Sequence, residues 1–199
     1  MSIPSLDPTA LIVALGYVGL FAIVFAESGL LFGFFLPGDS LLFTAGLLAS
    51  AGVLDIWILL IIIPIAAMLG DTVGYWFGSW TGPRIFKRED SFLFNKKHVE
   101  RAEKFYEKYG AKAIVLARFI PFVRTFVPIL AGVGRMNYRT FITYNIIGGL
   151  LWGVGVTLLG YFLGNFLPHA ENYLLPVIVG VVLISLVPLL REWWRARKR

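Results

Sequence analysis

Four charged residues stand inside otherwise apolar stretches of this sequence, and they are the first candidates for chemistry. They are two acids, Glu27 and Asp39, and two arginines, Arg118 and Arg124. A charge at the centre of a bilayer costs about 2.5–3.5 kcal/mol on insertion scales, so four unpaired charges would cost about 10–14 kcal/mol. We therefore expect the four to be paired, hydrated or close to the membrane surface.

The two residue types would do complementary chemistry at a shared site. Arginine presents a planar fork of donors that binds phosphate through two hydrogen bonds and keeps its charge. Arg118 and Arg124 flank a turn at Pro121 and suit an anionic head group. A desolvated carboxylate takes up a proton more readily than one in water. Glu27 and Asp39 therefore suit proton coupling or gating.

Structural roles compete with these interpretations. Asp39 and Ser40 fit the N-cap of a helix that starts there, and Arg124 fits a donor to free carbonyl groups at its turn. Asp71 and Asn145 stand in longer apolar stretches. The sequence leaves open whether these two act in the site or only in packing.

Composition sets the class of protein that must hold these residues. Of 199 residues, 58% are hydrophobic and 15% are charged, against about 45–50% and about 25% in soluble domains. A chain of this size has too little interior to bury that much apolar surface. We expect one membrane domain, 1–199, rather than a disordered chain, a soluble enzyme or a nucleic-acid-binding protein. With no cysteine and two isolated histidines, we expect no metal site and no cofactor.

Three stretches are long and apolar enough to cross a bilayer, which takes about 20 residues. They are 56–80, 140–167 and 172–190. Two further apolar stretches, 16–51 and 111–134, are each broken by a turn that contains proline, and their limbs are too short to span comfortably. We expect both to be re-entrant hairpins, with the turns buried in protein or lining a cavity.

The basic residues predict the orientation. Five acids and no base precede Arg84, whereas 84–112 holds nine bases and the tail after 190 holds five. Lys and Arg mark cytoplasmic segments, so we expect 84–112 and the C-terminus inside and the N-terminus outside. If each span crosses the membrane once and each hairpin returns to the side on which it started, the same orientation follows. The linker 84–109 contains an amphipathic pattern over 95–109, typical either of a helix on the inner leaflet or of a solvated linker.

The sequence contains a weak internal repeat. Residues 19–27 match 110–118 at five of nine positions, at an offset of 91. Two further pairs recur at an offset of 86: 45–46 with 131–132, and 74–78 with 160–164. The repeats are then 16–82 and 110–167, each a hairpin followed by a span, and they begin on opposite sides of the membrane. Inverted repeats with broken helices are typical of secondary transporters; a duplicated scaffold without transport is the alternative.

Several motifs together resemble the DedA family, whose relatives include the eukaryotic VTT-domain proteins. The motifs are Glu27, Phe35-Leu36-Pro37-Gly38-Asp39-Ser40, Gly70-Asp71-x-x-Gly74-Tyr75-x-x-Gly78, and Arg118-Phe119-Ile120-Pro121-Phe122-Val123-Arg124 followed by Ala131-Gly132. The resemblance implies a bacterial inner-membrane protein that moves lipids between leaflets, with undecaprenyl phosphate or phosphatidylethanolamine as substrate and a link to proton motive force. The family's acid pair and arginine pair match Glu27, Asp39, Arg118 and Arg124.

The combined prediction is an all-α integral membrane protein, not an enzyme. It is an inverted repeat of re-entrant hairpin plus transmembrane helix, with a C-terminal transmembrane helix and a cytoplasmic amphipathic helix. We expect a flippase or scramblase for a phosphate-bearing lipid, coupled to protons; an ion or small-solute transporter and a lipid phosphatase are alternatives. A homo-oligomer is a possible assembly. The phosphate ligands would be Arg118 and Arg124, the proton-coupling pair Glu27 and Asp39, and the supporting residues Pro37, Gly38, Ser40, Asp71, Pro121 and Asn145.

Overall fold

The computed structural model describes residues 8–29, 38–81, 107–120 and 123–166, and these residues form helices joined by turns, without a strand among them. The elements are α1 (Pro8–Gly29), α2 (Gly38–Ser50), α3 (Ile56–Thr81), the short 3-10 turn η3 (Gly110–Lys112), α5 (Ala113–Ala117), α6 (Val123–Val133) and α7 (Tyr138–Phe166). The prediction of an all-α fold is confirmed for this part of the chain.

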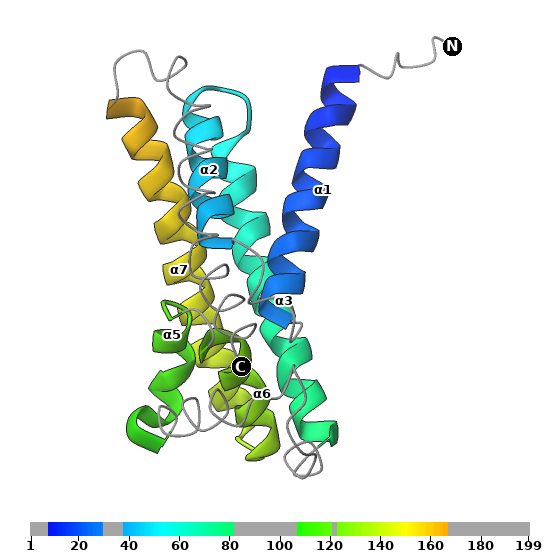
Figure 1. The fold of residues 1–199 in the computed structure, drawn as a ribbon, viewed down its shortest axis with the longest axis vertical. Coiled ribbons are helices and arrows are strands. Elements are labelled where there is room, and N and C mark those ends of the chain that lie inside the picture. The colour runs from blue at the N-terminus through cyan, green and yellow to red at the C-terminus, as the bar shows by residue number, and fades with distance from the viewer. Residues whose placement is uncertain (1–7, 30–37, 82–106, 121–122, 167–199) are drawn as a thin grey trace, which may run out of the picture.

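Two long helices run the whole height of the molecule, and the shorter ones fill its two ends (Figure 1). Helices α3 and α7 have 26 and 29 residues and are apolar enough to span a membrane; at 1.5 Å per residue they measure about 39 and 44 Å. They match the spans expected at 56–80 and 140–167. The span expected at 172–190 lies outside the described residues, as does the amphipathic segment apart from 107–109, which is helical.

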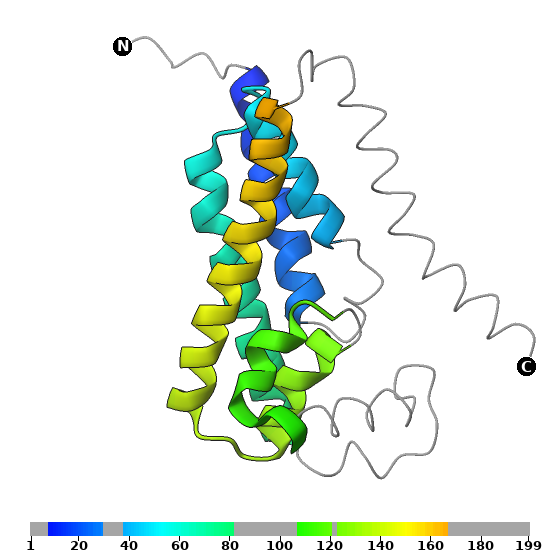
Figure 2. The ribbon, with the colours of Figure 1, turned by 90° about the vertical axis from the view of Figure 1, so that its left-hand side faces the viewer.

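The shorter helices form two pairs at opposite ends of the molecule (Figure 2). Helix α1 descends from the upper end and α2 returns to it, whereas α5 rises from the lower end and α6 returns to it. The expected hairpin at 111–134 covers α5 and α6, whereas the one at 16–51 covers α2 and only part of α1, which starts eight residues earlier, at Pro8. With 22 residues, about 33 Å, α1 is longer than the short limb expected there. Proline is favoured in the first turn of a helix, where its missing N–H has no partner to lose.

Helices α2 and α6 each pack on the long helix of the other half through glycine, whereas α1 packs on α3, the long helix of its own half. In the contact between α2 and α7, Gly46 lies against the Thr157 carbonyl and Gly160 lies against the Phe43 carbonyl. A Cβ atom at either glycine would overlap that backbone oxygen. These helices approach each other so closely because neither glycine has a side chain, as is common between membrane helices.

The contact between α6 and α3 repeats this arrangement. Gly132 lies against the Tyr75 carbonyl and Gly78 lies against the Ile129 carbonyl, again with no room for a Cβ atom. Equivalent contact residues of α2 and α6 (46 and 132, 43 and 129) are 86 positions apart in the chain, which is the offset of the sequence repeat. Equivalent contact residues of α3 and α7 (78 and 160, 75 and 157) are 82 positions apart. The packing therefore matches α3 to α7 four residues, or about one helical turn, away from the alignment that the sequence repeat gives.

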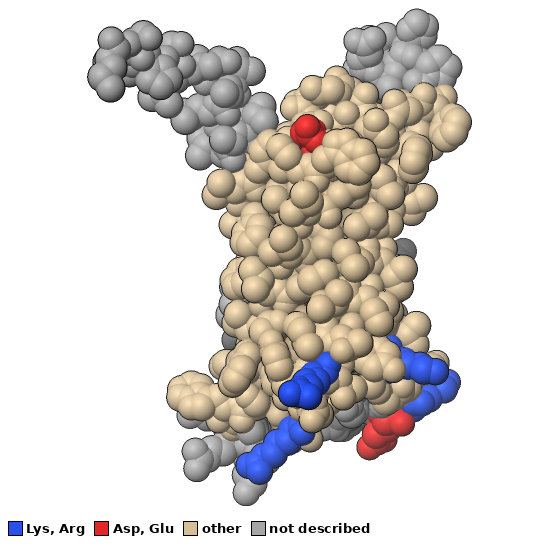
Figure 3. Space-filling view, turned by 180° about the vertical axis from the view of Figure 1, so that it is seen from behind, with Lys and Arg blue, Asp and Glu red and all other residues tan. Residues whose placement is uncertain are grey.

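The outer surface is apolar along its shaft and basic at one end. The exposed side chains of α3 and α7 are mostly large and hydrophobic, and Trp57 and Trp80 stand near the two ends of α3. Twenty-three residues of helix separate the two tryptophans by about 35 Å, which matches a hydrocarbon core of about 30 Å with aromatic residues at its borders. Figure 3 shows lysine and arginine gathered at the lower end of this face.

Candidate functional site

The site is a layer of charged and polar side chains between two apolar cores. The upper core contains the buried side chains of α3 between Leu59 and Ala67 together with Trp152 of α7, and the lower core contains Tyr75 of α3 and Phe141 of α7. Between these levels, α3 contributes Asp71 and α7 contributes Asn145, both buried. The two shorter helix pairs end at the same level and complete the layer.

Arg118, directly after α5, makes the first cluster of this layer. Its Nη2 donates to Asp71 Oδ2 at 2.5 Å and to Asn145 Oδ1 at 2.6 Å. Asn145 in turn donates through Nδ2 to the Met68 carbonyl of α3, at 3.0 Å. Arg118 is 4% exposed. A buried charge of this kind is tolerated because it is paired, and removal of one partner typically costs about 3–5 kcal/mol.

The path of the Arg118 side chain depends on a glycine of α7. A Cβ atom at Gly148 would lie 3.0 Å from Arg118 Cδ and 3.1 Å from Arg118 Nε. A side chain at this position would therefore require the Arg118 side chain to shift by a few tenths of an ångström. The sequence analysis did not single out Gly148, because glycine is frequent in membrane helices for packing alone.

Arg124, in the first turn of α6, makes the second cluster. Its Nη2 donates to Glu27 Oε1 and its Nη1 donates to Asp39 Oδ1, the latter at 3.0 Å. Trp152 of α7 donates from Nε1 to the same Asp39 oxygen at 2.7 Å. The guanidinium carbon of Arg124 lies 5.4 Å from the centre of the Trp152 ring, within cation–π range.

Glu27 reaches Arg124 because α2 begins with a glycine. A Cβ atom at Gly38 would overlap the Glu27 carboxylate. The Glu27 side chain is 1% exposed. Among the described residues its Oε2 has no hydrogen-bond partner. The absence of a side chain at Gly38, one of the predicted supporting residues, thus lets a carboxylate lie against the start of α2.

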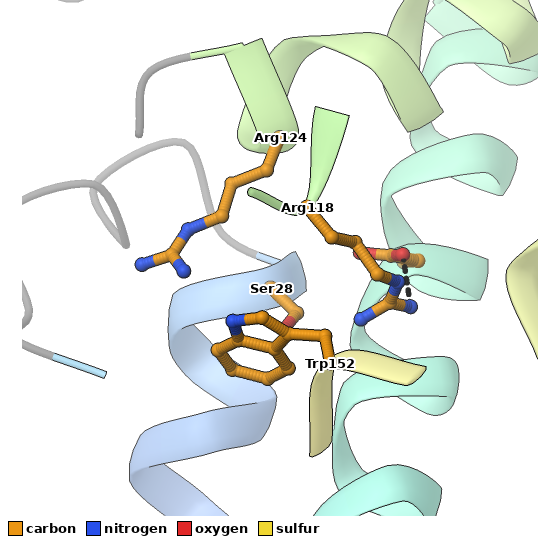
Figure 4. Close-up of a pocket in the computed structure, with 5 residues that line it drawn as sticks. Ser28, Arg118, Arg124 and Trp152 are labelled. Atoms are coloured by element: carbon orange, nitrogen blue, oxygen red, sulfur yellow. Dashed lines mark hydrogen bonds and ion pairs between the residues drawn. The ribbon is translucent and has the colours of Figure 1, made fainter. Parts of the chain in front are cut away.

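Among the described residues, the layer is most exposed at Asp39, and we call this its open side. The side chain of Asp39 is 52% exposed, whereas those of the other acids and both arginines are mostly or wholly buried. Between the clusters lies a small cavity lined by Ser28, Asp71, Arg118, Arg124 and Trp152 (Figure 4). Its volume is about 10 Å³, close to the least that holds one water molecule. A group larger than a water molecule therefore enters only if side chains of the layer move, and Asp39 is the most accessible of them.

The four residues singled out first are brought together, and each is paired. The repeat places Glu27 and Arg118 in equivalent positions, but the two are not partners. Instead Arg118 pairs with Asp71, and Glu27 pairs with Arg124. Asp39 accepts hydrogen bonds from two other helices, and Arg124 donates to carboxylates rather than to carbonyl groups.

The supporting residues divide into three groups. Asp71 and Asn145 belong to the layer itself, and Ser40 is buried in the first turn of α2. Pro37 and Pro121 lie outside the described residues. Within the described ranges, no group of three His, Asp or Glu side chains is arranged to hold a metal ion.

Sequence reasoning missed Trp152 and Ser28. Trp152 follows Asn145 by seven residues, which is two helical turns, so the two share a face of α7. This spacing could have placed Trp152 beside Asn145 in the layer. Trp152 was missed because a tryptophan in an apolar helix is more readily interpreted as a lipid-facing residue.

Fold and site together define an α-helical membrane protein with a buried ionic layer at mid-height. The profile of the VTT domain family matches residues 36–162. Protein DedA of Escherichia coli K12 is 45% identical over 174 residues, which cover 86% of this chain and 79% of that protein. The chain therefore belongs to the VTT domain family and is a DedA family membrane protein.

Two further relatives extend the comparison. An uncharacterized membrane protein of Mycobacterium leprae is 46% identical over 200 residues, covering 96% of this chain and 88% of the relative. The inner membrane protein YqjA of Escherichia coli K12 is 39% identical over 174 residues, covering 83% and 79%. No solved structure matches the chain.

Proposed function

We propose that this protein moves a phosphate-bearing lipid between the leaflets of a bacterial inner membrane, without covalent change to the lipid, and couples the movement to protons. Undecaprenyl phosphate and phospholipids belong to this substrate class. The observation that carries the proposal is the pair of buried arginines held by carboxylates at mid-height, where the two helix pairs meet. Arginine binds phosphate through paired hydrogen bonds, and a site at the midplane is typical of transporters.

The architecture supports a transporter. In this proposal the two helix pairs are re-entrant hairpins, and the halves of the chain form an inverted repeat. The reciprocal contacts support it: α2 packs on α7 as α6 packs on α3, through glycines at corresponding positions. Rocking of one half against the other would then expose the layer alternately to the two sides, as in other inverted-repeat transporters.

The proposed orientation follows from the charges. The described bases outside the layer gather at the lower end of the molecule (Figure 3), at Lys108, Lys112, Arg135 and Arg139. The positive-inside rule makes this the cytoplasmic end. Helices α1 and α2 then face the outside, and α5 and α6 face the cytoplasm.

The charge count of the layer supports a link to protons. The layer contains three carboxylates and two guanidinium groups. A phosphate bound at Arg124 adds a further anion, and a proton taken up by Glu27 or Asp39 offsets it. Phosphate binding and proton uptake thus favour each other, and release of both on the other side completes a transport cycle.

The same surplus carboxylate favours one alternative, a proton-coupled cation transporter. Asp39 is the exposed carboxylate of the layer, and Glu27, which shares Arg124 with it, is the buried one. Two such carboxylates suit the binding of a cation as well as of a proton. In this alternative, the arginines only fix the carboxylates in place.

Reconstitution separates the two functions. Purified protein is placed in proteoliposomes that contain a fluorescent phosphate-bearing lipid, and the lipid in the outer leaflet is quenched chemically. We expect the protein to make the inner-leaflet lipid accessible, faster with a proton gradient than without it. Cation flux under the same gradient without lipid movement would reject the lipid proposal in favour of the cation transporter.

A further inference from the structure

Two hydrogen-bond donors converge on one oxygen atom at the open side of the ionic layer. Arg124 Nη1 and Trp152 Nε1 lie 3.0 and 2.7 Å from Asp39 Oδ1. The donors come from α6 and α7, and the acceptor comes from α2. A cationic donor and a neutral donor aimed at a single anionic oxygen are what a site for one oxygen of an anion requires.

The acid that occupies this position is the exposed one of the three. The side chain of Asp39 is 52% exposed, against 1% for Glu27 and 5% for Asp71. Asp39 also stands in the first turn of α2, and the same carboxylate can be hydrated once it turns away from the layer. If Glu27 or Asp71 left its arginine, its carboxylate would enter apolar surroundings, and burial of an unpaired charge is costly.

Trp152 cannot follow Asp39 outward. Its side chain belongs to the upper apolar core and is almost fully buried. Its ring lies under the Arg124 guanidinium. If Asp39 turns away, the indole N–H and Arg124 Nη1 both lose their acceptor, and an unpaired donor on the almost fully buried Trp152 is unfavourable. Another anionic oxygen at the same point restores both hydrogen bonds.

We infer that Arg124 Nη1 and Trp152 Nε1 form the subsite for one phosphate oxygen of the substrate, and that Asp39 is an internal substitute that leaves as the phosphate arrives. Trp152 is then a substrate-binding residue, and Asp39 competes with the substrate. The inference rests on the proposed function, because it names how that site receives its phosphate. The exchange also explains how a head group enters a layer whose cavity holds about one water molecule.

The test measures binding of dodecyl phosphate to the purified full-length protein in detergent, by calorimetry. Four proteins are compared: the wild type, Asp39→Ala, Trp152→Phe and the double variant. Phenylalanine keeps a ring under Arg124 and removes only the N–H donor. Trp80→Phe, at an exposed tryptophan of α3, is the matched control and should bind like the wild type.

The two hypotheses for Trp152 give different results in the background without Asp39. If Trp152 binds the phosphate, the double variant binds about tenfold more weakly than Asp39→Ala, since a hydrogen bond to a charged group is worth about that factor. If Trp152 only holds Asp39, the double variant binds as tightly as Asp39→Ala, and the inference is overturned.

Asp39→Ala should itself bind dodecyl phosphate more tightly than the wild type, by about tenfold on the same reasoning. Equal or weaker binding would show that Asp39 is not a competitor and would overturn the inference. If Asp39→Ala does not fold, Asp39→Asn keeps the size of the side chain, and its uncharged amide should raise the affinity in the same direction. Absence of binding to the folded wild type would instead reject the proposed function, and the inference with it.

Discussion

Loss of the Asp71 carboxylate should destabilise the protein strongly, because it leaves the Arg118 guanidinium buried without its counter-charge. Arg118 is 4% exposed, and its Nη2 retains only Asn145 Oδ1, 2.6 Å away, once Asp71 is removed. Breaking a buried ion pair typically costs about 3–5 kcal/mol. Because the amide acceptor remains, we expect Asp71→Ala to fall at the lower end, about 3 kcal/mol.

For a chain of this size, 1 kcal/mol shifts the melting temperature by about 2–4 °C, so Asp71→Ala should melt about 6–12 °C lower. Thermal unfolding in detergent, followed by tryptophan fluorescence, measures the shift. The double variant Asp71→Leu/Arg118→Met should recover part of the loss, since two matched apolar side chains leave no unpaired charge. Glu107→Ala, at an exposed acid, is the control. An unchanged melting temperature for Asp71→Ala, or a double variant less stable than the single one, would refute this reasoning.

Three further predictions address the helix contacts, the orientation and the proton-coupling acid. Gly132→Ala should destabilise by about 1–3 kcal/mol, because its Cβ overlaps a backbone oxygen of α3, whereas Gly155→Ala, with open space around it, should not; equal melting temperatures would contradict this. A cysteine at Val53 should react with an impermeant thiol reagent in intact cells, and one at Arg139 only after permeabilisation; the reverse pattern would invert the orientation. Glu27→Gln, which keeps the acceptor and loses the charge, should move lipid without pH dependence. An unchanged pH profile in proteoliposomes would remove this acid from proton coupling.

The long helices and the need for the four isolated charges to be paired could be predicted from the sequence. The expected spans 56–80 and 140–167 differ from α3 and α7 by at most two residues at either end, because uninterrupted apolar length determines both. The cost of isolated charges in an apolar environment required Glu27, Asp39, Arg118 and Arg124 to find partners, and each does.

The choice of partners could not be predicted. Pairing of Arg118 with Asp71 depends on how far α3 is displaced along its axis relative to α5 and α7. The reciprocal glycine contacts place α3 and α7 one turn away from the register that the sequence repeat indicated. Backbone packing at glycines sets that displacement, and a glycine that packs on a carbonyl looks the same in sequence as one that faces lipid.

The role of Trp152 was missed for a related reason. Its N–H meets Asp39 only because α2 and α7 approach closely at Gly46 and Gly160. That approach is a tertiary contact between segments more than 100 residues apart in sequence. The spacing to Asn145 placed Trp152 on the correct face of its helix but gave no indication of its partner.

We propose that the arginines of the ionic layer bind the phosphate of a lipid as it crosses. The most direct measurement is the rate at which proteoliposomes exchange a fluorescent phosphate-bearing lipid between leaflets, for wild type, Arg124→Lys and Arg124→Ala, with Arg139→Ala as an exposed control. We predict that lysine is nearly as damaging as alanine, because a point charge does not replace the planar fork of donors, and that the control matches the wild type. Full lipid movement by the Arg124→Lys protein would contradict the claim.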